Sequence, residues 1–137
     1  MGKVSRFSIS LEPELLEKFN KIIKEKGYGS RSEAIRDLIR DKIVEEKWER
    51  GEEVVASLTL VYDHDVRGVT DKLTDLQHHY AGHMVSSMHV HLSGRSCMEV
   101  LVLRGRAEVV KKISEELLSS KGVKHGSLVI TGLAEEL

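Results

Sequence analysis

The stretch that decides the fold of the C-terminal half spans residues 89–99 and reads HVHLSGRSCME. Residues i and i+2 of a strand share one face, so His89 and His91 would project together, roughly 6.6 Å apart at Cα. Pairing about a central turn would place Cys97 opposite His91. The same pairing sets Glu99 opposite His89. Three candidate metal ligands would therefore converge from one hairpin.

Metal binding is the chemistry that this segment favours. Imidazole and thiolate side chains bind late first-row transition metals best. Residues 77–99 hold five of the seven histidines and the only cysteine. A lone histidine on a strand is usually a surface residue or a satisfied core residue. Two histidines at i and i+2, with a cysteine across the hairpin, favour a metal site instead. For His79 and His83 we keep the interpretation of a surface residue or a satisfied core residue.

Length and composition limit the class of protein. With 137 residues, 40% of them hydrophobic, the chain allows one ordinary domain or two small ones. No apolar run approaches the roughly 20 residues of a membrane span, and residues 1–6 lack the apolar core of an export signal. A single cysteine forms no intrachain disulfide, and a reducing compartment would keep it free as a thiolate ligand. We therefore expect a cytoplasmic protein.

The charge distribution is uneven along the chain. The net charge of −1 argues against a generic polyanion binder. Residues 1–50 carry 12 basic and 10 acidic side chains, whereas the remainder is net negative. The first eleven residues hold Lys3 and Arg6 and no acidic side chain. This local bias suits a short DNA-reading arm.

The first 50 residues predict a strand followed by two helices. Residues 3–11 alternate between polar and apolar side chains, as in a short strand. Pro13 fits the start of a helix that extends to about Lys26. Residues 30–33 (SRSE) form a capping box that starts a second helix, which ends near Arg50. Because one strand lacks a partner in so small a unit, we expect an obligate dimer with a two-stranded antiparallel ribbon.

The remaining residues predict a second domain. Gly51 marks the expected boundary between domains 1–50 and 51–137. The predicted elements are strands at 54–62, 84–92, 96–104 and 122–131, and helices at 66–80 and 107–120. Their order, β-α-β-β-α-β, is the ferredoxin-like pattern. The predicted fold class is therefore α+β, with a β-α-α unit followed by a ferredoxin-like domain.

His78 occupies a distinct position on the predicted 66–80 helix. The apolar side chains of this helix repeat every three or four residues. At about 100° per residue, His78 falls well off that stripe. It would point away from its own core, toward solvent or a neighbouring molecule. A solvent-exposed helix residue is the alternative interpretation.

Both halves resemble known families. Residues 6–11 (RFSISL) and 29–36 (GSRSEAIR) resemble ribbon–helix–helix repressors. The second half resembles the ACT-type regulatory domain. Its segments 77–79 (QHH), 89–91 (HVH) and 97–99 (CME) look like the metal motif of nickel-responsive regulators. The resemblance covers nearly the whole chain, with both halves in the same order.

The resemblance implies a specific metal site. His89, His91 and Cys97 would bind Ni²⁺ from one subunit. His78 would supply a fourth ligand from another subunit of a homotetramer, a dimer of dimers. The site would be square-planar, built from three nitrogens and one sulfur. The protein would be a nickel-dependent repressor that binds DNA, typically at nickel-uptake genes. Spacing alone does not select the metal, because such donors also suit tetrahedral Zn²⁺, and Cu²⁺ ranks above Ni²⁺ in affinity.

Five further side chains are candidates for supporting roles. Glu99, Tyr62 and Gln77 could orient the metal ligands through hydrogen bonds. Glu33 and Asp37 lie four residues apart on one helix face, and similar regulators have a secondary cation site at the matching positions. A solvated acidic patch is the alternative for that pair.

A two-stranded ribbon fits the major groove of DNA. Its polar face would present Arg6, Ser8 and Ser10 of each chain to the base edges of double-stranded operator DNA. The start of the second helix would hold a phosphate. The residues expected to contact the DNA backbone are Lys3, Ser30, Arg31 and Ser32.

Two other functions remain open from the sequence. A metal-independent ribbon–helix–helix repressor, whose ACT-like domain senses a small molecule, would bind DNA in the presence of chelator. A metalloenzyme would need an open coordination position beside an acid or base. Four protein ligands leave no obvious site for water, and Glu99 alone gives little support for catalysis, so we expect no enzymatic activity.

Overall fold

The structure is a computed structural model that describes residues 2–137. These residues form two compact units, the first ending at Arg40 and the second spanning Asp41–Leu137. The division falls inside helix α2 (Arg31–Glu49), upstream of the boundary predicted at Gly51. None of the helices in the described part of the chain has the length and apolar character needed to cross a membrane.

The last turns of α2 belong to the second unit because they are packed there. Trp48 is half-buried against the core of that unit. Lys47 pairs with Glu136 in the short C-terminal helix η2 (Ala134–Glu136). The sequence predicts the domain boundary at a glycine, whereas the contacts of the folded chain divide it within the helix. The limits 1–50 and 51–137 therefore stay a prediction about domains.

The first unit contains the two predicted helices. Helix α1 (Pro13–Lys26) has proline in its first turn and ends at Gly27, whose φ of 73° is left-handed. Ser30 Oγ accepts a hydrogen bond from the Glu33 amide at 3.2 Å, as the capping box predicts. The Glu33 carboxylate accepts the Gly29 amide at 2.9 Å, one residue before the serine.

The predicted strand at residues 3–11 is not present in the single chain. Residues 2–12 have no assigned helix or strand. Val4, Phe7 and Ile9 are 91%, 71% and 63% exposed. A strand needs a neighbouring strand to satisfy its backbone groups, and the described part of this chain provides none for this segment.

The second unit has the predicted β-α-β-β-α-β order. The bounds are β1 (Glu53–Asp63), α3 (Val69–His79), η1 (Ala81–His83), β2 (Met84–Ser93), β3 (Ser96–Arg106), α4 (Ala107–Leu118) and β4 (Val123–Thr131). The four strands form one antiparallel sheet in the order β2-β3-β1-β4. This order confirms the ferredoxin-like prediction.

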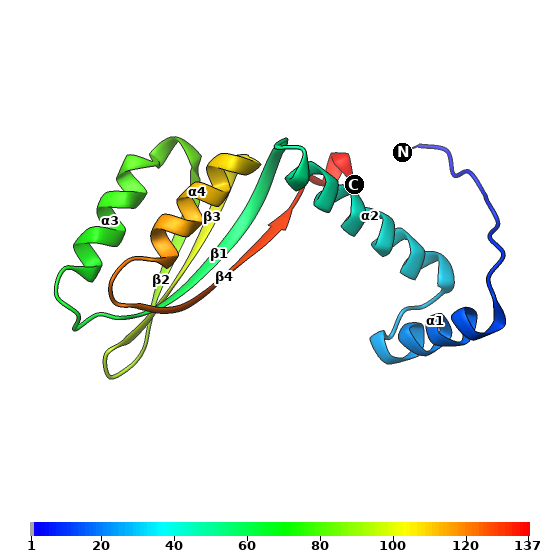
Figure 1. The fold of residues 1–137 in the computed structure, drawn as a ribbon, viewed down its shortest axis with the longest axis horizontal. Helices are drawn as coiled ribbons and strands as arrows, with labels where there is room; N and C mark the ends of the chain where they lie inside the picture. The colour runs from blue at the N-terminus through cyan, green and yellow to red at the C-terminus, as the bar shows by residue number, and fades with distance from the viewer. Residues whose placement is uncertain (1) are drawn as a thin grey trace. The chain divides into compact units, whose positions relative to one another are not determined.

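One face of this sheet is covered and the other is open. Helices α3 and α4 lie on the same side of the strands (Figure 1). Alternate residues of β1 are buried, from Val54 to Tyr62, and they pack with the apolar side of α4. On the other face, Met88 and Val129 are 57% and 59% exposed. The core therefore lies between the helices and one face of the sheet.

The hairpin register agrees with the sequence prediction. Strands β2 and β3 pair His89 with Glu99 and His91 with Cys97. Directly paired residues project to the same face of an antiparallel pair. Cys97 belongs to the buried core, so both histidines lie on the helix-covered face.

We predict that Gly126→Ala destabilises the second unit by about 1–3 kcal/mol. A methyl group at Gly126 would lie 2.7 Å from the carbonyl oxygen of Thr59 and would also meet Leu118. Strand β4 would have to move away from β1. Gly82→Ala is the matched control because no heavy atom lies within 4 Å of its added methyl group. Urea unfolding, followed by Trp48 fluorescence at fixed protein concentration, should separate the two variants; equal midpoints would contradict the prediction.

Candidate metal centre

The hairpin brings one histidine and the cysteine together. The β2–β3 turn contains Gly94, whose φ of 44° is left-handed and favours glycine. His91 and Cys97 face each other across the two strands, and His91 Nδ1 lies 3.7 Å from Cys97 Sγ. Cys97 is only 3% exposed, whereas His91 is exposed. The pair therefore lies where the core meets the solvent.

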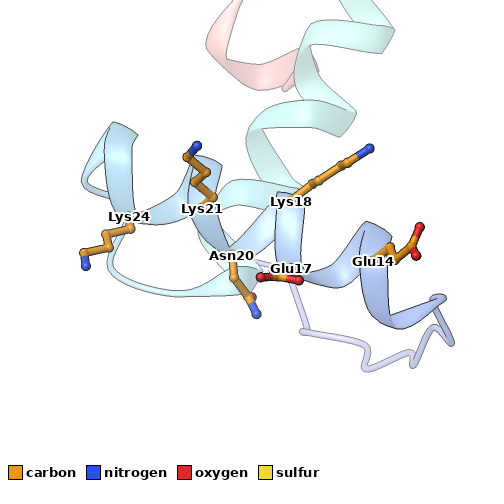
Figure 2. A pocket seen from close by; sticks show the side chains of 6 residues that line it. All are labelled: Glu14, Glu17, Lys18, Asn20, Lys21 and Lys24. Carbon is orange, nitrogen blue, oxygen red and sulfur yellow. The ribbon is translucent and has the colours of Figure 1, made fainter.

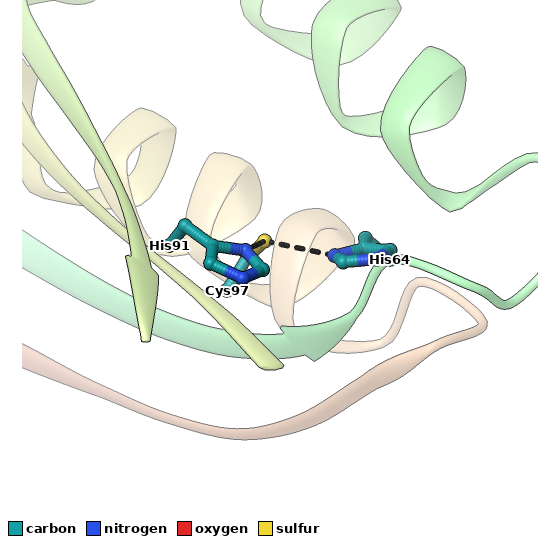
Figure 3. Close-up of side chains that lie close together, drawn as sticks. All are labelled: His64, His91 and Cys97. Carbon is teal, nitrogen blue, oxygen red and sulfur yellow. Dashed lines mark hydrogen bonds between the residues drawn. The ribbon is translucent and has the colours of Figure 1, made fainter. Parts of the chain in front are cut away.

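His64, which is not among the predicted ligands, joins this pair. It follows β1, and its Nδ1 lies 3.3 Å from Cys97 Sγ (Figure 3). The rings of His64 and His91 stack with centroids 5.5 Å apart. All three donor atoms lie within 4.8 Å of one another. No local sequence pattern reveals His64, because its position follows from the pairing of Tyr62 with Cys97 between the distant strands β1 and β3.

The donors fit a transition-metal ion. Metal–nitrogen bonds of about 2.0–2.1 Å and metal–sulfur bonds of about 2.3 Å allow a nitrogen and a sulfur on one ion to lie at most about 4.4 Å apart. The separations of 3.3 and 3.7 Å from Cys97 Sγ to the two imidazoles meet that limit. A thiolate with imidazoles is the donor set preferred by Zn²⁺, Cu²⁺ or Ni²⁺ over hard cations.

The other two predicted ligands lie outside this cluster. His89 shares the face of His91 but is exposed, with its ring centroid 6.0 Å from that of Tyr62. His78 is exposed on the last turn of α3. Within the described residues, a single chain therefore gathers two of the four predicted ligands, His91 and Cys97. The complete four-residue set stays a prediction.

The three predicted supporting residues form a hydrogen-bonded group beside the donors. Glu99 accepts one bond from Tyr62 Oη at 3.3 Å and another from Gln77 Nε2 at 2.7 Å. Burial raises the pKa of Tyr62 to about 12, and the Glu99 carboxylate and Cys97 sulfur act in the same direction. The phenol therefore stays a proton donor at neutral pH. These hydrogen bonds connect α3, β1 and β3. Their shared acceptor, Glu99, is paired across the hairpin with His89.

The predicted DNA-contacting residues lie on accessible parts of the first unit. Lys3, Arg6, Ser8 and Ser10 are exposed. At the start of α2, Arg31 Nε donates to Asn20 Oδ1 at 3.0 Å. Ser30, Arg31 and Ser32 are also exposed.

The predicted secondary cation pair makes contacts within the first unit. The Glu33 carboxylate accepts a hydrogen bond from the Gly29 amide. Asp37 Oδ2 accepts a hydrogen bond from Tyr28 Oη at 2.7 Å, and Asp37 Oδ1 lies 3.9 Å from Arg40 Nη1. These contacts occupy the two carboxylates separately, so the cation site stays a prediction.

A hollow on α1 does not make a second site. Its lining mixes both charge signs, and the side chains extend in different directions from the helix (Figure 2). The lining residues are Glu14, Glu17, Lys18, Asn20, Lys21 and Lys24. All of them are exposed, so no desolvated group is present to select a ligand.

Comparisons with known proteins match both halves of the chain. Residues 55–131 match the family described as "NikR C terminal nickel binding domain". Residues 5–46 match "Ribbon-helix-helix protein, copG family". These two matches correspond in type and order to the two predicted units.

Two relatives share more than half of their residues with this chain over nearly its whole length. A relative from Geobacter metallireducens is 56% identical over 138 residues, covering 100% of this chain and 99% of the relative. One from Thermococcus kodakarensis is 52% identical over 136 residues, covering 98% and 99%. Both are named as nickel-responsive regulators. A solved structure of an uncharacterized Thermotoga maritima protein has a TM-score of 0.52 at 18% identity, covering 58% of this chain and 98% of that one; it supports the fold alone.

We predict that the Tyr62 hydroxyl affects stability at high pH. Its folded pKa of about 12 lies above the usual tyrosine value of about 10. The resulting stabilisation is present below pH about 10 and is lost as pH rises toward 12, because the unfolded chain releases that proton first. Metal-free wild type should therefore lose unfolding free energy more steeply in this window than Tyr62→Phe. Equal slopes for wild type and Tyr62→Phe would refute the prediction.

Proposed function

The chain belongs to the family of nickel-responsive regulators, and from that membership we propose that it is a nickel-dependent transcriptional repressor of nickel-uptake genes. It is a regulator and not an enzyme. The observation that carries the proposal is the hairpin pairing of His91 with Cys97, with His89 on the same face. This pairing lies within the segment matched by the nickel-binding family.

In the proposed site, His89, His91 and Cys97 of one subunit would hold Ni²⁺ together with His78 of another. Nickel would supply a positive centre that joins the two chains. The exposure of His78 and its absence from the donor cluster of its own chain support an intersubunit role. The hydrogen bonds of Glu99 would orient the surrounding side chains.

Apolar surfaces in both units support a homotetramer. In the first unit, Phe7, Ile9 and Leu38 are 71%, 63% and 58% exposed. Pairing two such units would form the ribbon and bury these side chains. In the second unit, the open sheet face presents exposed Met88 and Val129. Two separate apolar surfaces would join the chains as a dimer of dimers.

The paired ribbon would bind double-stranded operator DNA in the major groove. Arg6, Ser8 and Ser10 alternate with apolar residues and would face the bases. Lys3 and the residues 30–32 would contact the DNA backbone. Nickel would regulate binding by favouring the tetramer arrangement that fits two half-sites, which requires tighter nickel binding to that arrangement than to others. The proposed location is the cytoplasm.

We predict that Arg6→Ala weakens specific operator binding by about 1–3 kcal/mol for each base that Arg6 reads. The arginine fork can donate to guanine O6 and N7, which alanine cannot do. The measurement is operator affinity of the nickel-loaded protein at fixed salt, with non-specific DNA as the reference. Lys24→Ala, on the last turn of α1, is the control for loss of charge. An Arg6→Ala variant with wild-type operator affinity would rule out base reading by Arg6.

We predict that His78→Ala lowers nickel affinity at least about tenfold and uncouples DNA binding from nickel. His64→Ala should have a smaller effect, although His64 lies nearer to Cys97 in the single chain. Chelator competition and the thiolate–nickel absorption band of the full chain provide the measurements. His125→Ala, at an exposed position of β4, is the control, and Cys97→Ser should abolish the band. A larger loss in His64→Ala than in His78→Ala would assign the fourth ligand to His64.

A further inference from the structure

Helix α3 is packed unevenly along its length. Its buried residues, Val69 and Leu73, lie in its first half. The last turn, residues 77–79, contains Gln77 at intermediate exposure followed by two exposed histidines. Core packing therefore fixes the start of the helix better than the turn that bears His78.

Two side-chain hydrogen bonds hold that last turn. Gln77 donates to Glu99 on β3 at 2.7 Å. Tyr80, directly after the helix, donates to Glu116 on α4 and lies 3.0 Å from both carboxylate oxygens. His78 lies between these two residues in sequence. The turn is thus connected to the sheet on one side and to α4 on the other.

The backbone and the ring of Tyr80 also make contacts that help to hold the last turn of α3. Its amide donates to the Leu76 carbonyl at 3.0 Å, and its carbonyl accepts the His83 amide at 2.9 Å. Its ring is half-buried against the core and meets the His79 ring edge-on at 4.7 Å. The backbone of Tyr80 therefore joins α3 to the following η1, while its side chain joins the same point to the core and to α4.

We propose that Tyr80 and Glu116 are positioning residues that hold the His78 turn in its metal-binding orientation before nickel arrives. This inference rests on the proposed role of His78 as a ligand. When a ligand side chain is correctly placed only part of the time, the apparent metal affinity is the intrinsic affinity multiplied by that fraction of time. The Tyr80–Glu116 hydrogen bond raises that fraction in the metal-free protein.

The test compares Tyr80→Phe and Glu116→Ala with Glu115→Ala, an exposed neighbour on the same helix. In the metal-free full chain, amide hydrogen exchange at residues 77–79 should be several-fold faster in the first two variants and unchanged in the third. Nickel affinity, measured by chelator competition, should fall by up to about tenfold in the first two variants. Glu116→Gln, which keeps an acceptor oxygen, should restore part of the affinity.

A double-mutant cycle separates positioning from general destabilisation. In a His78→Ala background, Tyr80→Phe should cause no further loss of nickel affinity, because its effect acts through His78. An equal loss in both backgrounds, or unchanged amide exchange in Tyr80→Phe, would overturn the proposal. If His78→Ala lowers nickel affinity and Tyr80→Phe does not, this inference alone fails. If His78→Ala has no effect, the proposed intersubunit ligand and this inference fail together.

Discussion

The two-residue alternation of the sheet is the constraint on which the site depends, because one face buries the core and also carries the metal donors. Strands β1, β3 and β2 align Tyr62, Cys97 and His91 in one row. Leu101 and Leu103 follow on the same face of β3 and are fully buried. A one-residue slip of β3 would expose both leucines, at about 1.5–3 kcal/mol each, and would turn Cys97 to the open face. Aliphatic burial therefore sets the donor positions without help from a metal ion.

This constraint explains which part of the site could be predicted from sequence. The pairing of His91 with Cys97 depends on a turn centre and an alternation, and both are visible within eleven residues; the structure confirms it. His64 was missed because its proximity to Cys97 depends on how β1 pairs with β3, and that pairing joins strands distant in sequence. Glu99 was correctly placed opposite His89. Its bond to Gln77 could not be derived, because it depends on how α3 packs against the sheet.

The helices and strands of the second unit followed from periodicity because that unit completes its own core. The ribbon segment differs. Its alternation was readable, but a lone chain offers no strand to pair with residues 3–11, and the segment remains without assigned strand structure. The same limit applies to His78, whose outward orientation is predicted by the helix periodicity but whose proposed contacts would come from another chain. Sequence patterns were thus sufficient for elements whose core and strand partners lie in one chain, and for contacts within one hairpin, but not for contacts set by packing between distant elements.

Burial changes sharply among the candidate donors of the hairpin. Cys97 is part of the core, whereas His89 and His91 reach the surface. A donor set completed within one chain would bind metal whatever the oligomeric state. Under the proposed assignment, the donors are divided between chains, so nickel affinity and assembly geometry become linked, and each must favour the other by the same free energy. That reciprocity is what a metal-responsive regulator requires, since tight binding by itself shifts no equilibrium between conformations.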